Sequence, residues 1–315
     1  AANAINEAGS VVVGAAYWNA TFEYPNNRYA ARWTRSAATG AWQAEDLRPL
    51  LPPHKRSSGT QVNDAGTVVV SVEYRDSSQH WFVITSAGPM REFGPMEAVA
   101  DLDDADRLIG TRYAADASQV AKPLYWASPS AAVVELPVLQ TGYGGQTHLF
   151  EGLDILGVLA DASGDWLVRW RQVDGAWNVE RVLQLPRSYS LTGVSPGGRV
   201  AFMHCTGTRY YMKTPIGCEW RAAGWDPPYA GAPAYLPNLA GTYSWTGGVM
   251  DDGTVTGITV ASNGVDMLPV LWPTPMTLVQ LPLLTGGKAG APPQRALDLA
   301  LFGGGSPARG CLPAR

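Results

Sequence analysis

Four histidines are the side chains of this sequence best suited to acid–base or metal chemistry. They stand in four unrelated contexts, at His54, His80, His148 and His204. The chain lacks the spacings that bring metal ligands, or a nucleophile and its base, together locally: it has no His-Glu-x-x-His, Cys-x-x-Cys, Gly-x-Ser-x-Gly or phosphate-loop pattern. The sequence therefore predicts no catalytic residue and no cofactor. Any site must be assembled from segments that are far apart in the chain.

The chain has three cysteines, and their spacing allows one disulfide. Cys205 and Cys218 flank residues 206–217, between two strand-like runs, and a hairpin there brings their Cα atoms within reach of a disulfide. Closing a loop of this length contributes about 3 kcal/mol in the chain-entropy model. The alternative is two buried free thiols. A disulfide predicts an extracellular, cell-surface or periplasmic location, and Cys311 remains as an odd thiol that offers a route to covalent pairing.

The composition narrows the class of partner. Charged residues make up 16% of the chain, and the formal net charge is −4 without a basic patch, which argues against nucleic acid. No apolar stretch reaches the roughly 18 residues that span a bilayer. Residues 1–4 carry neither a charged nor an apolar leader, as in the mature end left by signal cleavage or in a trimmed chain. We expect a monomer without a membrane span.

Six degenerate repeats organise the chain. Gln61-Val-Asn-Asp-Ala-Gly-Thr-Val-Val-Val70 has a close counterpart in Ala4-Ile-Asn-Glu-Ala-Gly-Ser-Val-Val-Val13. Asn or Asp followed by Gly supplies the positive φ angles of tight hairpins, and a short β-branched run favours a buried strand. The spacings of the turns, between 40 and 57 residues, are typical of propeller blades. The six turn positions are Gly9, Gly66, Asp106, Gly157, Gly198 and Gly253.

Two further features recur after each turn. A Leu/Pro-rich segment closes each repeat, as in Leu136-Pro-Val-Leu139. Five repeats also contain an apolar run that ends in tryptophan, which we expect to be a buried third strand; the second repeat has His80-Trp-Phe-Val-Ile84 instead. The five tryptophans expected at equivalent buried positions are Trp33, Trp126, Trp170, Trp220 and Trp272.

Each repeat is therefore interpreted as four short antiparallel strands. Such a meander cannot bury both of its faces alone, whereas radial stacking of several meanders does so. The sequence predicts an all-β protein, a β-propeller of six four-stranded blades, with seven blades as the alternative. Residues 285–315 form a Gly/Pro-rich C-terminal tail that either closes the propeller or extends from it. The expected blades are residues 1–52, 53–97, 98–140, 141–187, 188–240 and 241–284.

The repeat resembles that of the bacterial extracellular HAF family. The resemblance lies in Asn/Asp-x-Gly followed by Val-Val-Gly, an apolar segment that ends in Trp, and a closing Leu-rich segment, and it covers about residues 4–284. It implies a secreted β-propeller. The family repeat carries no catalytic signature, so it assigns no site residue to this chain.

One repeat turn is unusually acidic. Asp101-Leu-Asp-Asp-Ala-Asp106 alternates carboxylates in a way that suits calcium, and Asp101, Asp103 and Asp106 are the candidate ligands. The run nevertheless occupies the position of the tight turns, and it lacks the central Gly and the following Glu of calcium loops. A turn without an ion is therefore the preferred interpretation, and no other metal site is expected.

Loop length suggests where a ligand would bind. The Asn/Asp-x-Gly turns are uniformly short, whereas the connections on the opposite face of the blades are long and contain aromatic and arginine side chains, which recognition surfaces favour. These connections are residues 15–29, 51–60, 110–121, 140–147 and 206–217. The candidate ligand-binding residues are Trp18, Tyr24, Arg28, Tyr29, His54, Arg56, Tyr143, His148, Arg209, Tyr210 and Tyr211.

The leading functional hypothesis is a secreted or cell-surface module that recognises a protein or a glycan without catalysis. One alternative is an extracellular propeller hydrolase or lyase whose residues converge near the axis from several blades. Another is a structural component of a surface assembly, attached through Cys311 and the tail. The fold alone does not decide among them, because propellers serve all three purposes.

Overall fold

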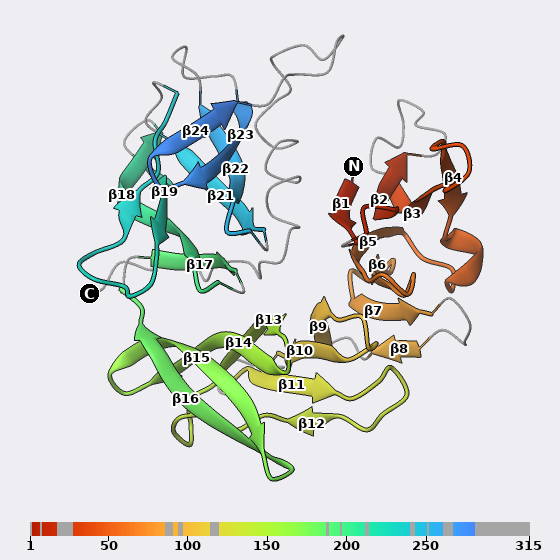
Figure 1. The fold of residues 1–315 in the computed structure, drawn as a ribbon, viewed down its shortest axis with the longest axis horizontal. Helices are drawn as coiled ribbons and strands as arrows, with labels where there is room; N and C mark the ends of the chain where they lie inside the picture. Colours follow the sequence, from red (N-terminus) through yellow and green to blue (C-terminus); the bar gives the residue numbers. More distant parts are fainter. Residues whose placement is uncertain are drawn as a thin grey trace. The chain divides into compact units, whose positions relative to one another are not determined.

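The computed structural model is all-β, with 24 strands and a single 3₁₀ turn, η1 (Arg48–Leu50), among the residues it describes. The strands form six four-stranded antiparallel sheets in which each strand pairs with the next one along the chain (Figure 1). No helix in this part of the chain is long and apolar enough to cross a membrane. The described residues are 2–6, 8–17, 28–85, 91–93, 97–113, 120–186, 189–195, 197–211, 214–239, 243–250, 252–260 and 267–280.

The first compact unit, Ala1–Gln184, contains four sheets. The expected four-strand meander is confirmed in each of them. The strands are β1 (Ala2–Ile5), β2 (Val11–Tyr17), β3 (Arg28–Arg35) and β4 (Trp42–Asp46); β5 (Arg56–Val62), β6 (Val68–Glu73), β7 (Gln79–Ile84) and β8 (Arg91–Phe93); β9 (Glu97–Leu102), β10 (Leu108–Arg112), β11 (Lys122–Trp126) and β12 (Val134–Glu135); and β13 (Gly145–Glu151), β14 (Asp154–Asp161), β15 (Gly164–Val173) and β16 (Ala176–Gln184).

The second compact unit, Leu185–Arg315, contains the other two sheets. Residues 206–217 are expected to be a loop, but residues 206–211 and 214–217 instead lengthen the central strands of the fifth sheet, because the Thr-Gly-Thr-Arg-Tyr-Tyr run is well suited to a strand. The strands are β17 (Tyr189–Val194), β18 (Val200–Tyr211), β19 (Thr214–Trp225) and β20 (Ala234–Tyr235); and β21 (Ser244–Val249), β22 (Val255–Val260), β23 (Met267–Thr274) and β24 (Thr277–Gln280). The predicted tail lies outside the described residues.

The turn between the first two strands of a sheet is stabilised by hydrogen bonds to the side chain of its first residue. In the second sheet the Asn63 Oδ1 atom accepts a hydrogen bond from the Thr67 amide at 2.9 Å, and the Gly66 amide donates to the Asn63 carbonyl at 3.1 Å. Gly66 has a φ of +80°, which favours glycine. Ser195 repeats the arrangement in the fifth sheet, where its hydroxyl accepts from the Arg199 amide at 3.0 Å. The recurring motif therefore specifies the turn locally.

Each first strand also contains a β-bulge near the end of its pairing with the second strand, two residues before the last paired residue in five sheets and three residues before it in the fourth. The bulge leaves one residue unpaired and increases the local twist. It recurs in all six sheets, so it belongs to the repeat even though the sequence pattern did not reveal it. The bulged residues are Asn3, Thr60, Ala100, His148, Thr192 and Gly247.

The third-strand tryptophan packs over a glycine of the second strand. A Cβ atom added to Gly157 would lie 2.7 Å from Cζ3 of Trp170, and one added to Gly257 would lie 2.6 Å from Cζ3 of Trp272. Gly110 and Trp126 form the same pair in the third sheet. The glycine of the Val-Val-Gly pattern is thus required because a first-strand carbonyl oxygen and the indole together occupy the space of its side chain: the oxygens of Ala98, Gln146 and Trp245 would lie 2.2, 2.3 and 2.1 Å from the added Cβ atoms.

Where the glycine is absent, the tryptophan is absent or displaced. The second sheet has Val70 and Ile84 in place of the pair. In the fifth sheet Phe202 fills the space, and the register pairs Val200 with Trp225 rather than with Trp220. The equivalence predicted for Trp220 is therefore wrong: Trp225 occupies that place and is only half-buried.

The first repeat keeps the register but not the burial. Trp33 pairs with Val12, which stands two residues before Gly14 as Leu108 stands before Gly110, and Trp33 is only half-buried. Trp126, Trp170 and Trp272 are fully buried, as predicted.

The Leu/Pro segments connect neighbouring sheets. The indole Nε1 of Trp170 donates a hydrogen bond to the Pro137 carbonyl at 2.7 Å, and that of Trp272 donates to the Pro237 carbonyl at 2.9 Å. In both cases the acceptor follows the fourth strand of the preceding sheet. The third-strand tryptophan and the Leu/Pro segment of the preceding repeat therefore contact each other, and this contact gives the buried indole N–H its hydrogen-bond acceptor.

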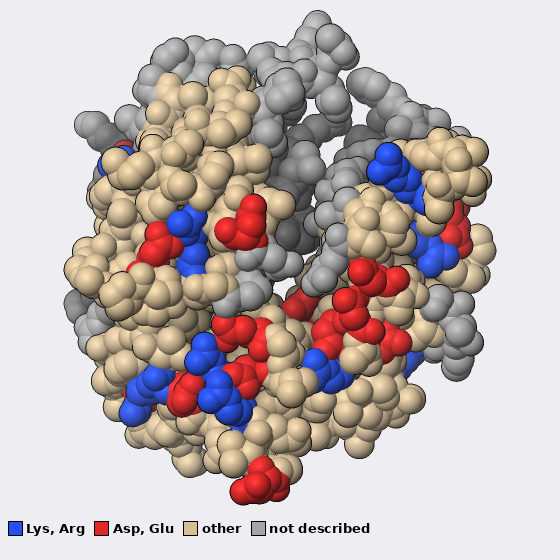
Figure 2. All heavy atoms as spheres, viewed as in Figure 1, with Lys and Arg blue, Asp and Glu red and all other residues tan. Residues whose placement is uncertain are grey.

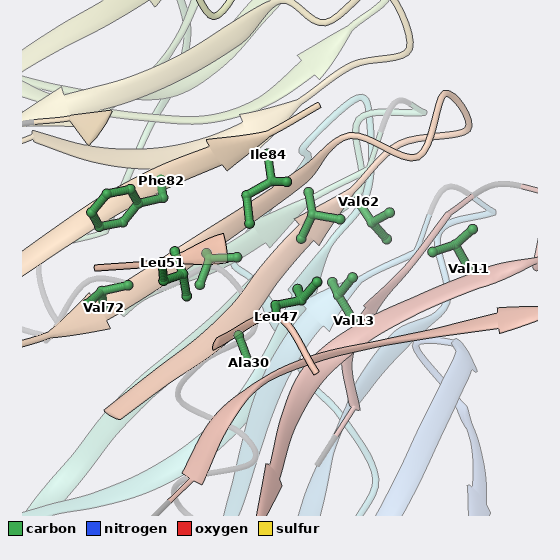
Figure 3. Close-up of a cluster of buried hydrophobic side chains, with 11 residues drawn as sticks. Val11, Val13, Ala30, Leu47, Leu51, Val62, Val72, Phe82 and Ile84 are labelled. Carbon is green, nitrogen blue, oxygen red and sulfur yellow. The ribbon is translucent and has the colours of Figure 1, made fainter. Parts of the chain in front are cut away.

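Apolar side chains fill the space between adjacent sheets. Between the first two sheets they come from β2, β3, β5, β6 and β7, with Leu47 and Leu51 from the segment before β5 (Figure 3). On the outside, acidic and basic side chains are interspersed over β13–β16 (Figure 2), where Arg169 pairs with Glu151 at 2.8 Å and Arg171 with Asp154 at 2.6 Å. Exposed ion pairs of this kind contribute little to stability.

Candidate functional site

A pocket of about 560 Å³ opens in the first compact unit, between the segment that precedes β5 and the turn between β6 and β7. Both segments belong to the face on which the sequence predicts recognition. The lining is polar and aromatic, with proline as its single aliphatic member. We refer to this site as the His54–His80 pocket; it is lined by Pro53, His54, Tyr74, Arg75, Asp76, Ser78 and His80.

Both ring nitrogens of His54 are engaged. Nδ1 lies 2.7 Å from the Pro52 carbonyl oxygen, which can only accept, so Nδ1 carries the proton. Nε2 lies 2.8 Å from the Ser57 hydroxyl, and Tyr29 meets the ring edge-on with centroids 5.5 Å apart. The Arg48 guanidinium covers the Tyr29 ring at 4.7 Å. These contacts hold His54 in one orientation on the pocket wall.

The Ser57–His54 hydrogen bond invites a comparison with nucleophilic catalysis, in which a histidine activates a serine. Ser57 is only 3% exposed, however, and its hydroxyl accepts a hydrogen bond from the Ala30 amide at 2.9 Å. Ser244 holds the same register position in the sixth sheet and accepts from the Ala222 amide at 2.9 Å, with no histidine in that arrangement. The serine therefore joins adjacent sheets in both places.

Tyr74 and His80 form the opposite wall. Their rings meet edge-on with centroids 4.8 Å apart, and His80 Nδ1 lies 2.6 Å from Oε1 of Glu92. Since a carboxylate accepts, Nδ1 donates, and Nε2 is the nitrogen left for a ligand. Burial, together with the nearby Glu92, raises the pKa of the Tyr74 phenol, so this hydroxyl stays neutral and can both donate and accept.

The β6–β7 turn supplies the charged groups. Oδ1 of Asp76 accepts hydrogen bonds from the hydroxyl and the amide of Ser78, at 2.7 and 2.9 Å, and these bonds hold the pKa of the carboxyl below its ordinary value. Arg75 is exposed beside it. The pocket thus combines a cation, a carboxylate, a hydroxyl and aromatic rings, a set that can bind a polar ligand by hydrogen bonds and ring contacts.

Behind the pocket, Glu73 at the end of β6 receives two cations. Lys55 Nζ lies 2.7 Å from Glu73 Oε1, and Arg56 pairs with Oε2. Burial alone would raise the pKa of Glu73, but the hydrogen bonds from Lys55 and Arg56 outweigh it and leave the pKa below its ordinary value. Arg56, a predicted ligand-binding residue, is therefore committed to an ion pair.

Of the predicted site residues, Tyr29, His54 and Arg56 lie together around this pocket. Arg28 begins β3, while Tyr143 lies before β13 and His148 within it, in the fourth sheet. His148 occupies the bulge of β13 rather than a loop, and burial lowers its pKa to about 4. The predicted residues Trp18 and Tyr24 lie outside the described residues, as do the side chains of Arg209, Tyr210 and Tyr211.

Each carboxylate of the calcium candidate has a separate protein partner. Asp101 accepts from the Phe150 amide at 2.9 Å, and Asp103 from the Arg107 amide at 2.8 Å. Asp106 accepts from the Asn63 side chain at 2.8 Å and has a φ of +60°. In the described residues no group of three or more His, Cys, Asp or Glu side chains is arranged to hold a metal ion.

The sequence interpretation missed Tyr74, Arg75, Asp76 and Ser78. It searched for long connections, and this turn spans only five residues between β6 and β7. Its composition was the available signal, because Tyr-Arg-Asp is unusually rich in binding side chains for so short a turn.

Neither the protein-family models nor the curated protein sequences match the chain. Solved structures do. The β-propeller domain of the Trilobed protease from Pyrococcus furiosus aligns with a TM-score of 0.52 at 8% identity, over 90% of this chain and 84% of that one. A prolyl endopeptidase aligns with a TM-score of 0.55 at 11% identity, over 88% and 41%. TolB from Acinetobacter baumannii aligns with a TM-score of 0.48 at 13% identity, over 84% and 61%.

At these identities the likeness concerns the fold, and it defines the class: the chain is a β-propeller. With its six four-stranded sheets as blades, it is a six-bladed β-propeller, as the repeats predict. The chain spans less than two thirds of the length of TolB and of the prolyl endopeptidase.

Proposed function

We propose that this propeller is a recognition module whose ligand, a protein or a glycan, binds in the His54–His80 pocket. The observation that carries the proposal is the convergence of Tyr74, Arg75, Asp76 and His80 with His54 around a single pocket. These side chains are absent from the repeat motif, so the scaffold does not require them there. Function is one reason to keep such residues on a loop surface.

The state of the histidines favours binding over catalysis. His54 has both ring nitrogens occupied, and the hydroxyl that it contacts is buried. A general base needs a nitrogen within reach of the substrate proton. His80 does retain Nε2, which suits it to accept a hydrogen bond from a ligand.

The test is an array of glycans and protein ligands, probed with the wild-type chain and two pocket variants. His80→Ala removes one wall, and Pro53→Phe places a large side chain on the exposed Pro53 position. We expect each to weaken binding at least about tenfold, the usual loss at a recognition hot spot. Thermal melts of both variants check that they remain folded.

Trp42→Ala is the matched control, because Trp42 is an exposed aromatic residue of β4 outside the pocket. A ligand that binds both pocket variants as well as it binds wild type would move the site elsewhere. The second candidate function is hydrolysis, favoured by the Ser57–His54 contact at 2.8 Å. Turnover of an arrayed compound that disappears in Ser57→Ala, in a variant whose thermal melt matches wild type, would replace recognition with that activity.

We also propose that the chain works outside the cytoplasm, as a HAF-type propeller with a Cys205–Cys218 disulfide. The ladder supports this bond: Cys205 pairs with Trp220 and Cys218 with Thr208, so the cysteines lie on adjacent strands on either side of a bulge. In protein made under oxidising conditions, mass spectrometry of a non-reduced digest should find the two peptides linked. Two free thiols in such material would contradict both the bond and the location it implies.

A further inference from the structure

Arg75 differs from the other cations of this protein. Among the Lys and Arg side chains that the structure describes, it alone has neither a hydrogen-bond acceptor nor an aromatic ring as a partner. Elsewhere in the described chain the positive charges are balanced by carboxylates, carbonyls or ring faces. An uncompensated guanidinium on the wall of a pocket is available for a planar anion, which it binds with two parallel hydrogen bonds.

The carboxylate of Asp76, next to Arg75 in the sequence, accepts hydrogen bonds from the described residues through only one of its two oxygens. Both hydrogen bonds from Ser78 end on Oδ1 of Asp76, and no described donor reaches Oδ2. The fourth sheet contains the same Asp-x-Ser turn: Asp161 Oδ1 binds Ser163, but Oδ2 there is bound by Arg181 at 2.6 Å. The turn at Asp76 has no such arginine, so its two adjacent residues Arg75 and Asp76 bring a cation and an acceptor oxygen to the same pocket.

The remaining lining suits a sugar better than a peptide side chain. Apart from Pro53 it consists of groups that can bond to hydroxyls, namely Ser78, Tyr74 and the free nitrogen of His80. The Tyr74 and His54 rings add flat surfaces against which the apolar face of a sugar ring packs. The lining therefore combines apolar ring surface with a few polar groups that fix the orientation of a ligand.

We propose that the His54–His80 pocket binds an acidic glycan through a hexuronic acid residue, with the sugar carboxylate on Arg75 and a neighbouring hydroxyl on Asp76 Oδ2. This inference rests on the proposed recognition function and specifies its ligand. Tyr74 packs against the sugar ring, and His80 accepts a hydrogen bond from a second hydroxyl. No covalent step is involved.

The test compares oligosaccharides of galacturonic, glucuronic and mannuronic acid with the same oligosaccharides as methyl esters. Esterification removes the charge and keeps the ring and its hydroxyls. We expect the full chain to bind at least one acid about 10- to 100-fold more tightly than its ester, the range of a charge-assisted hydrogen-bonded pair. Arg75→Gln should reduce binding of the acid to the level of the ester, and added salt should weaken the acid but not the ester.

Arg35→Gln is the matched control, because Arg35 is an exposed arginine of β3 outside the pocket and its loss changes the net charge by the same amount. It should bind like wild type, and thermal melts of both arginine variants should agree with wild type within a few degrees. The inference is overturned if the acid binds no better than its ester. It is also overturned if the acid binds Arg75→Gln as tightly as it binds wild type.

The failures of the two proposals are distinguishable. If a neutral glycan binds, and His80→Ala or Pro53→Phe abolishes its binding, the acidic ligand is the wrong class and the recognition function still holds. Acidic peptides that bind in an Arg75-dependent way, without any uronate binding, overturn the glycan class. If no compound of either array responds to a pocket variant, the recognition site itself is lost along with the inference.

Discussion

Replacing Trp170 by alanine should lower the free energy of unfolding by about 3–5 kcal/mol. Its side chain is completely buried in a cluster with Ile155, Leu159 and Val168, and its Nε1 donates the hydrogen bond that ties the fourth sheet to Pro137 of the third. Truncation leaves a cavity that cannot collapse, because Gly157 opposite has no side chain to fill it, and it removes the hydrogen-bond donor of the Pro137 carbonyl.

Denaturant unfolding of purified variants measures this effect. Trp42→Ala is the control: Trp42 is 47% exposed, so we expect a change within about 0.5 kcal/mol. Trp170→Phe keeps an aromatic ring in the cluster while it loses the Nε1 hydrogen bond and part of the indole volume, so it should destabilise less than Trp170→Ala. A loss below about 1 kcal/mol for Trp170→Ala would show that the repeat core is not organised around the indole.

The second large effect is a dependence of stability on pH through His148. Its folded pKa is about 4, because burial at the β13 bulge disfavours the charged ring, whereas the ordinary value is 6.5. Between these values the unfolded chain binds more protons than the folded chain, so stability is full above pH 6.5 and falls as the pH drops toward 4. From pH 8 to pH 5 the loss should be at most about 2 kcal/mol, because the His148 side chain is half-buried and water screens part of the effect.

His148→Gln isolates this contribution, because glutamine does not titrate. The measurement is the difference between wild type and variant in the free energy of unfolding, followed from pH 8 to pH 5, where most carboxylates remain ionised. We expect the wild type to lose more stability than the variant; His204, whose pKa burial also lowers, contributes equally to both curves and cancels in the difference. Parallel curves would mean that His148 stays hydrated in the folded state.

Five of the six turns could be predicted because their chemistry is local; in the fourth repeat the turn lies at Gly152, and Gly157, the predicted turn position, is inside β14. Asn63 caps its own turn and Gly66 adopts the positive φ, so six residues contain the whole explanation. The tryptophans were harder to place. In the fifth repeat Trp220 and Trp225 both end plausible strands, and the choice depends on Phe202, which fills the space that glycine leaves open in other sheets.

The candidate site was predictable only in part. His54 stood out because it lies in a long connection, but its neighbours Tyr74 to Ser78 occupy a turn too short to attract notice. His148 seemed a loop residue, because a bulge has no signature in hydrophobic alternation. Arg56 forms an ion pair with Glu73, whereas Arg75 lines the pocket without a carboxylate partner among the described residues. This difference depends on which carboxylates lie nearby, and sequence spacing does not report that.

By itself the sequence determined the number of sheets, their four-strand meander and the buried tryptophans of three repeats. These follow from interactions within one repeat, where hairpin turns, β-branched runs and the Gly–Trp pair act over short separations. The tertiary structure decided the rest: which serines join adjacent sheets, which histidine keeps a free nitrogen, and which arginine faces a pocket without a partner. Those properties arise between segments packed side by side, where a neighbour's charge and volume, rather than a residue's own type, determine its state.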